Sequence, residues 1–220
     1  MAKKSGTQAP RLEALRFGEL EASSGDELDA HGSFENLRIS GADLGGRDLS
    51  GMVMRESVLD DVQAHETVFH GSTFSEVELT RFNAPVLTAP RVQWRDVTLS
   101  ASRLGSAEMY EASFNSVRIS GSKIGFINAR GSNMLDVLFE DCSIDELDLS
   151  GSTLTRVSFF NTTVRSISLE HTKLTNVDLR GADFSQIDGY SALRGATLSS
   201  YQVSMLASSF ATHLGVIVED

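Results

Sequence analysis

Apolar residues recur with a period of five along most of this chain. Residues 32–191 divide into 32 consecutive blocks of five, and the middle position is a large apolar residue in 27 of them. The other five centres are four alanines and Gly189. The position two before the centre is nearly always apolar or small, and its one charged residue is Arg47. Charged residues gather in the other three positions, so the place within a block separates a dry interior from a solvated surface.

A period of five excludes one long helix or one flat strand, because those repeat every 3.6 and every two residues. A chain that turns a corner every five residues keeps one residue in five on one face. The last position of the block is glycine eight times, and Pro85 and Pro90 stand one position earlier. Proline before a residue that tolerates positive φ favours a type II turn. Four blocks per coil give eight stacked coils, about 38 Å long at ~4.8 Å per coil.

Several blocks match a known repeat unit. ADLGG at 42–46, LDLSG at 147–151, VDLRG at 177–181 and ADFSQ at 182–186 resemble the A-(D/N)-L-x-x unit of pentapeptide repeat proteins. The resemblance extends over about three quarters of the chain, residues 32–191. It implies an all-β solenoid, a right-handed quadrilateral β-helix, with the centre and the centre-minus-two side chains inside.

Both ends of such a stack need caps, because an open stack exposes strand edges. Residues 1–31 are out of phase with the repeat and are expected to form an N-terminal tail and cap, with the segment 11–22 against the first coil. The phase slips after Gly189, so residues 192–220 are expected to form a C-terminal helical cap and a candidate dimerisation element. Residues 216–218 suggest a short terminal strand.

The C-terminal helix is expected to begin near Ser199 or Ser200, which are suited to an N-cap, and to end at Gly215. Apolar residues at helical spacing mark the face that meets the last coil, a partner subunit or both. They are Val203, Leu206, Phe210 and Leu214.

The tail also resembles the ends of pentapeptide repeat proteins linked to quinolone resistance, the Qnr type and its mycobacterial relative. The matching residues are Leu193, Arg194, Gly195, Leu198, Tyr201, Gln202, Leu206, Leu214, Gly215 and Val218. In that group the C-terminal helix forms a two-fold dimer, and the resulting rod mimics duplex DNA and binds DNA gyrase. The resemblance implies a homodimer and gyrase as a partner; capping alone is the alternative role for the helix.

The charge distribution gives limited support to DNA mimicry. The chain has 19 Lys+Arg and 30 Asp+Glu, a net charge of −11, which argues against passive binding to nucleic acid or to an anionic membrane. Sorted by face, residues 32–191 carry −1, −2, −2 and −3, so no face dominates. Three acidic pairs form the candidate partner surface, with ordinary solvated charge as the alternative. The pairs are Asp60/Asp61, Glu140/Asp141 and Asp145/Glu146, of which the last two fall on adjoining faces of one coil.

No pattern in the sequence indicates catalysis, a cofactor or a metal. The histidines lack a carboxylate-rich cluster at metal-ligand spacing, and no nucleophile elbow, P-loop or dinucleotide fingerprint occurs. Cys142 is the only cysteine and stands at an inward position, where a small core residue is expected. No apolar run approaches the ~20 residues of a membrane helix. We therefore expect a cytoplasmic, non-enzymatic protein that binds a protein partner, with DNA gyrase the most concrete candidate. A structural or adaptor solenoid with another partner is the alternative, and an enzyme accessory is a weaker one.

Overall fold

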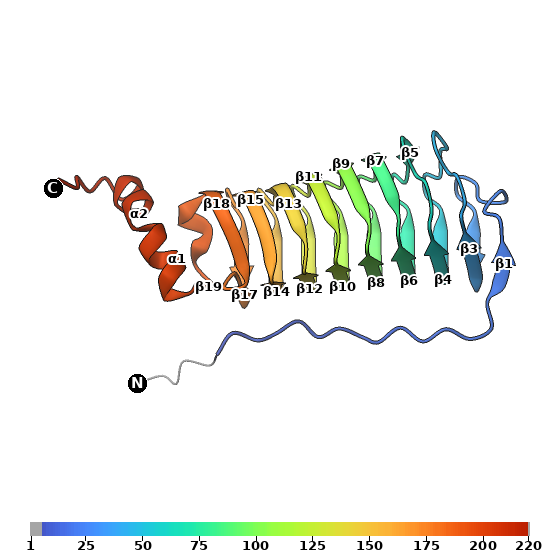
Figure 1. Cartoon of the computed structure of the whole chain (residues 1–220), viewed down its shortest axis with the longest axis horizontal. Coiled ribbons are helices and arrows are strands. Elements are labelled where there is room, and N and C mark those ends of the chain that lie inside the picture. The colour runs from blue at the N-terminus through green and yellow to red at the C-terminus, as the bar shows by residue number, and fades with distance from the viewer. Residues whose placement is uncertain (1–5, 220) are drawn as a thin grey trace.

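A computed structural model describes residues 6–219 and shows a long stack of parallel strands with a helical segment at one end (Figure 1). The strands form a 12-stranded and a 7-stranded sheet. The first sheet contains β1 (Glu21–Ser23), β2 (Ser33–Glu35), β3 (Leu37–Ser40), β4 (Val53–Asp60), β6 (Thr73–Thr80), β8 (Gln93–Ser100), β10 (Ser113–Ser120), β12 (Asn133–Glu140), β14 (Thr153–Phe160), β16 (Lys173–Thr175), β17 (Val177–Asp178) and β19 (Ala196–Thr197). The second contains β5 (Thr67–Val68), β7 (Asn83–Thr88), β9 (Arg103–Glu108), β11 (Lys123–Asn128), β13 (Ser143–Asp148), β15 (Thr162–Ser168) and β18 (Ala182–Asp188).

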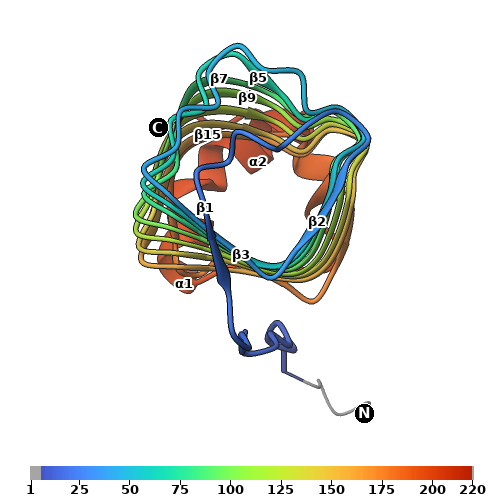
Figure 2. The ribbon, with the colours of Figure 1, turned by 90° about the vertical axis from the view of Figure 1, so that its right-hand side faces the viewer.

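From β2 to β18, paired strand residues lie 20 positions apart in successive coils, as Val117 does with Val97 and Val137. Four blocks of five therefore make one turn, and the turns superpose as a ring when seen down the stack (Figure 2). The predicted parallel β-solenoid is confirmed. The strands β1 and β19 extend it at its two ends by pairing with β3 and β17.

The corners follow the predicted chemistry at most positions. Arg91, after Pro90, has a left-handed φ of 58°. The turn expected at Pro85 is wrong. The next residue, Val86, does not have a left-handed φ, and β7 continues through the corner. The same corner lacks a left-handed residue in later coils, at Ser106, Phe126 and Glu146, where β9, β11 and β13 also continue.

The core is a continuous column of side chains at the centre and centre-minus-two positions. Serine and threonine at the second position are buried without loss of hydrogen bonds. The Ser102 hydroxyl, for example, donates to the Ser100 carbonyl at 2.7 Å and accepts from the Phe82 N–H at 3.0 Å. Because these hydroxyls bond the backbone of the corner, small polar residues are stable inside the solenoid.

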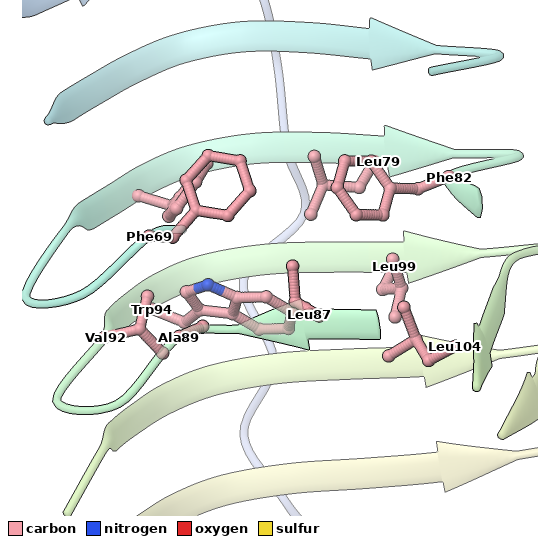
Figure 3. Close-up of a pocket in the computed structure, with 10 residues that line it drawn as sticks. Phe69, Leu79, Phe82, Leu87, Ala89, Val92, Trp94, Leu99 and Leu104 are labelled. Carbon is pink, nitrogen blue, oxygen red and sulfur yellow. The ribbon is translucent and has the colours of Figure 1, made fainter. Parts of the chain in front are cut away.

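Trp94 fills much of the space beside the small residue Ala89. Its ring makes edge contacts with Phe74 and Phe114, at centroid distances of 6.3 and 5.7 Å. A closed apolar cavity of about 20 Å³ remains next to it (Figure 3), which is room for about one water molecule. The indole N–H of Trp94 has no hydrogen-bond partner among the described residues.

Arg47, the one charged residue at an inward position, binds the loop that closes the N-terminal end of the stack. Its guanidinium lies at the N-terminal end of the stack, where it donates to the carbonyls of Gly25 at 2.8 Å, Asp26 at 3.2 Å and also Leu28. Leu28 in turn is buried over the first coil. Arg47 therefore holds the loop that closes this end.

The segment before β1 does not stay at the first coil, which corrects the expectation for residues 11–22. Residues 6–20, called the strap below, run beside the whole stack from β1 towards β19 (Figure 1). Thr7 reaches Thr197 through a hydroxyl–hydroxyl bond. The apolar residues of the strap lie too far apart to cover one coil and instead contact several. Residues 1–5 of the predicted tail, and Asp220, lie outside the described residues.

The other end is closed by helical segments as predicted. A 3₁₀ turn at Tyr190–Leu193 precedes α1 (Ser200–Met205) and α2 (Ala207–His213). Ser199 is the N-cap, with a reciprocal bond to Gln202, and Gly215 follows α2 with a φ of 71°. Residues 216–218 do not form the expected strand, since no neighbouring strand pairs with them.

Candidate partner-binding surface

Three of the six predicted surface acids are neutralised by arginines. Glu140 meets Arg118 from the previous coil at 2.9 Å. Asp145 lies 3.2 Å from Arg165 of the next coil, and Asp60 pairs with Arg81. The predicted ridge is therefore less negative than its sequence suggests.

The remaining three acids are exposed on the surface. Asp141 accepts a hydrogen bond from Asn161 at 2.6 Å, while Asp61 and Glu146 make no ion pair among the described residues. Asp141 and Glu146 come from adjoining faces of one coil, and Asp61 lies four coils away on the same corner as Asp141. The structure thus places two free acids close together and the third at a distance.

A further acidic row was missed by the sequence reasoning. Glu56, Glu76 and Asp96 occupy one corner of three successive coils, each with a left-handed φ, and Asp136 follows two coils later. Asp96 lies 3.5 Å from Arg95, and Asp136 pairs with Arg156. Glu56 and Glu76 make no ion pair among the described residues and repel one another from neighbouring coils, so the negative potential of the row concentrates at these two residues. Comparison of residues at intervals of 20 in the sequence would have revealed it.

Asp136 is the most constrained member of this row. The Arg156 guanidinium donates two hydrogen bonds of 2.6 Å to its carboxylate, and the backbone N–H of Arg11 in the strap donates a third at 2.8 Å. Burial alone would raise the pKa of Asp136, but these hydrogen bonds and the arginine charge outweigh it and lower the pKa. Asp136 therefore stays ionised and links the strap to the coils.

Replacing Asp136 by Asn is expected to lower the thermal midpoint at pH 7. Because the pKa of Asp136 is lower in the folded chain, its ionised form stabilises the fold above the ordinary carboxyl pKa of about 4. That contribution is lost as the pH falls through the lowered folded pKa. The difference in midpoint between the wild type and Asp136→Asn, measured by circular dichroism, should shrink as the pH falls below the ordinary carboxyl pKa of about 4.

The exposed Asp183→Asn variant serves as the matched control and should track the wild type throughout. A gap between the wild type and Asp136→Asn that stays constant down to the lowest pH would contradict the assignment.

The four predicted residues of the C-terminal helix separate into two pairs. Leu206 is buried against the last coil, and Phe210 packs against Tyr190 with ring centroids 5.5 Å apart. Val203 and Leu214 are 46% and 74% exposed. Capping and a free apolar face therefore coexist in one helical segment.

Gln202 is a capping residue that the sequence reasoning did not single out for that role. Its side-chain amide is buried and donates to the carbonyls of Leu179 at 2.7 Å and Ala182 at 2.8 Å. These carbonyls belong to the last coil, so Gln202 satisfies groups that the end of the stack would leave open. The capping box with Ser199 fixes its position.

Neither the histidines nor Cys142 assemble into a reactive centre. Within residues 6–219 no group of three His, Cys, Asp or Glu side chains could hold a metal ion. Cys142 is buried, which raises the pKa of its thiol, and its S–H group points at the Glu140 carbonyl at 3.2 Å. In the described part of the chain no helix is long and apolar enough to cross a membrane.

Comparison with known proteins points to one repeat family. The family described as Pentapeptide repeats matches in eight copies, over residues 38–80 and 154–188. Curated protein sequences give no match.

Two solved structures have the same fold. One trypsin-treated variant of QnrB1, a plasmid-mediated fluoroquinolone resistance protein, has 18% sequence identity and a TM-score of 0.56, over 90% of this chain and 96% of that one. A second such variant has 17% identity and a TM-score of 0.51, over 90% and 95%. HetL, a pentapeptide repeat protein involved in heterocyst differentiation regulation from the cyanobacterium Nostoc sp. strain PCC 7120, has 17% identity and a TM-score of 0.28, over 80% and 94%.

Proposed function

We propose that this chain, whose sequence matches the pentapeptide repeat family over residues 38–80 and 154–188, acts without catalysis, as a cytoplasmic scaffold that binds a protein partner through its outer rows of side chains. The observation that carries the proposal is the register of 20 residues, which holds outward side chains in rigid lines along the stack. Such lines offer a partner a fixed pattern of charge. The interior is filled and leaves only small apolar cavities.

The most concrete version is a DNA-mimicking dimer that binds DNA gyrase and modulates its activity or its inhibition by quinolones. The support is the similarity in fold to a fluoroquinolone resistance protein, together with the net charge of −11 and the acidic corner row.

The charge density limits how such mimicry works. The four faces of residues 32–191 carry a net charge of −8, one per coil. Duplex DNA carries one charge per ~1.7 Å, or about three in the height of one coil. Mimicry by this chain must therefore rest on local groups, such as the exposed Glu56 and Glu76 of the corner row along which the strap also runs, rather than on the whole surface.

The test is DNA supercoiling by gyrase, titrated with the full chain in the presence and absence of a fluoroquinolone. Inhibition or drug protection at low micromolar protein supports the proposal. The Glu56→Gln/Glu76→Gln variant should then lose the effect. A matched control, Glu170→Gln/Asp183→Asn, removes the same charge from exposed positions on other faces and should keep it.

An unaltered supercoiling reaction at all protein concentrations would count against gyrase as the partner. It would favour the alternative, an adaptor solenoid that binds a different protein.

The dimer is tested separately, by light scattering on the intact chain. Val203→Asp/Leu214→Asp changes only exposed apolar residues, so a dimer through this face should become a folded monomer. A wild-type chain that is already monomeric at high micromolar concentration would remove the dimer from the proposal.

A further inference from the structure

The strap binds the solenoid in a way that differs from every other segment. Among residues 6–20, no backbone group bonds to the backbone of another described residue. Three N–H groups instead donate to side chains of one corner row. Gln8 reaches Asn176 at 3.5 Å, Arg11 reaches Asp136 at 2.8 Å and Glu13 reaches Ser116 at 3.1 Å.

Apolar side chains supply the rest of the contact. Five of them are half-buried, at alternating intervals of two and three residues: Pro10, Leu12, Leu15, Phe17 and Leu20. The intervening polar residues, such as Arg11 and Glu13, are exposed. An extended chain with one buried edge accounts for this alternation.

Two outward residues beside the strap, Val58 and Leu138, are apolar in a row that is otherwise polar, with Arg38, Glu78, Thr98, Arg118, Ser158 and Asp178. Leu138 stands at an outward position of β12 and is half-buried. Together with Pro10, Leu12 and the 60% exposed Phe160, it lines an open hollow of about 510 Å³ that Arg118, Glu140 and Asp178 also border. Val58 occupies the same outward row as Leu138 and is only 5% exposed. This row and the neighbouring corner row are called the track below.

The strap therefore occupies the track as a ligand does. It makes few hydrogen bonds, it contributes no strand to either sheet, and its removal leaves every coil paired. Segments with few buried contacts and no ladder open at low free energy, independently of the rest of a fold.

We propose that the track is a binding site for an extended peptide of a partner protein, and that the strap is an exchangeable ligand which covers it. The peptide would carry apolar side chains at intervals of two and three residues, with backbone N–H groups free to bond the corner row. This inference does not depend on gyrase as a partner.

The test uses a fluorescein-labelled synthetic peptide of residues 6–20, added to the full chain and followed by anisotropy. In the wild type the tethered strap competes at an effective concentration on the order of millimolar. Leu12→Asp weakens the strap without touching the coils, so this variant should bind the peptide at least ~10-fold more tightly than the wild type does.

Two controls isolate the track. A peptide with serine in place of Leu12 and Leu15 should not bind. Adding Leu138→Asp to the Leu12→Asp chain should abolish binding, while circular dichroism shows the coils intact.

Hydrogen exchange on the same proteins shows whether the strap opens independently of the coils. In the wild type the strap amides should exchange much faster than those of β10 and β12. Strap amides as protected as these strands, in both the wild type and Leu12→Asp, would make the strap a fixed part of the fold and overturn the proposal. A strap that is released in Leu12→Asp, with no peptide bound, would overturn it as well.

Discussion

Phe159→Ala should destabilise this protein by about 3–5 kcal/mol, the usual loss for truncating a buried aromatic residue. The Phe159 ring is 3% exposed and stacks on Phe139 from the previous coil, with centroids 4.9 Å apart and planes within 6°. Each coil buries its side chains only against its neighbours. A cavity at this point therefore weakens the contact between two halves of the stack.

The adjacent residue provides the control. Phe160 is 60% exposed on the outer surface, so Phe160→Ala should change the free energy of unfolding by no more than about 0.5 kcal/mol. Urea denaturation followed by circular dichroism compares the two variants. Equal losses would show that Phe159 and Phe160 do not differ in burial as the structure places them.

Gly195→Ala should have the second large effect, confined to the C-terminal end. Gly195 has a φ of 94°, and a Cβ atom there would lie 2.0 Å from the Leu174 carbonyl oxygen. Left-handed backbone costs a residue with a Cβ about 1–2 kcal/mol, and the overlap adds to this. Because the Gly195 carbonyl accepts from Val177, the shift should also loosen β17 and β19.

The matched substitution is Gly121→Ala, at a corner with a φ of 55° and no atom closer than 3.9 Å. Alanine already occupies the same corner one coil earlier, as Ala101 with a φ of 49°. Gly121→Ala should therefore cost no more than the about 1–2 kcal/mol of left-handed backbone. Hydrogen exchange should show loss of protection over 174–206 for Gly195→Ala alone. Similar losses in both variants would mean that left-handed strain, and not the overlap, sets the cost.

The solenoid was predictable because its signal is local and repeated. Each block of five carries its own apolar centre. A block whose centre is small, such as the one with Ala84 or Gly189, therefore leaves the pattern recognisable. The helix start at Ser199 was predictable for a similar reason, since a capping box lies within four residues.

The strap was not predictable by the same means. Its apolar residues fit neither a helix nor a strand, and its partners lie between 103 and 190 positions away in the chain. The acidic surface was only partly predictable from the sequence. Outward phase was evident from the sequence, but the pairing of Glu140 with Arg118 spans 22 residues. Contacts between coils are visible in the sequence only when it is read at intervals of 20.

The length of the strap is also matched to the number of coils that it passes. From Gln8 to Arg11 it advances three residues, while its acceptors Asn176 and Asp136 lie two coils apart. Two coils rise about 9.6 Å, which three extended residues span at ~3.2 Å each. From Arg11 to Glu13 it advances two residues, while Asp136 and Ser116 lie one coil apart. The strap thus passes three coils in five residues, so gain or loss of one coil by repeat duplication would turn its apolar edge away from the stack. Length changes that keep this edge in phase come in steps of three coils and five strap residues.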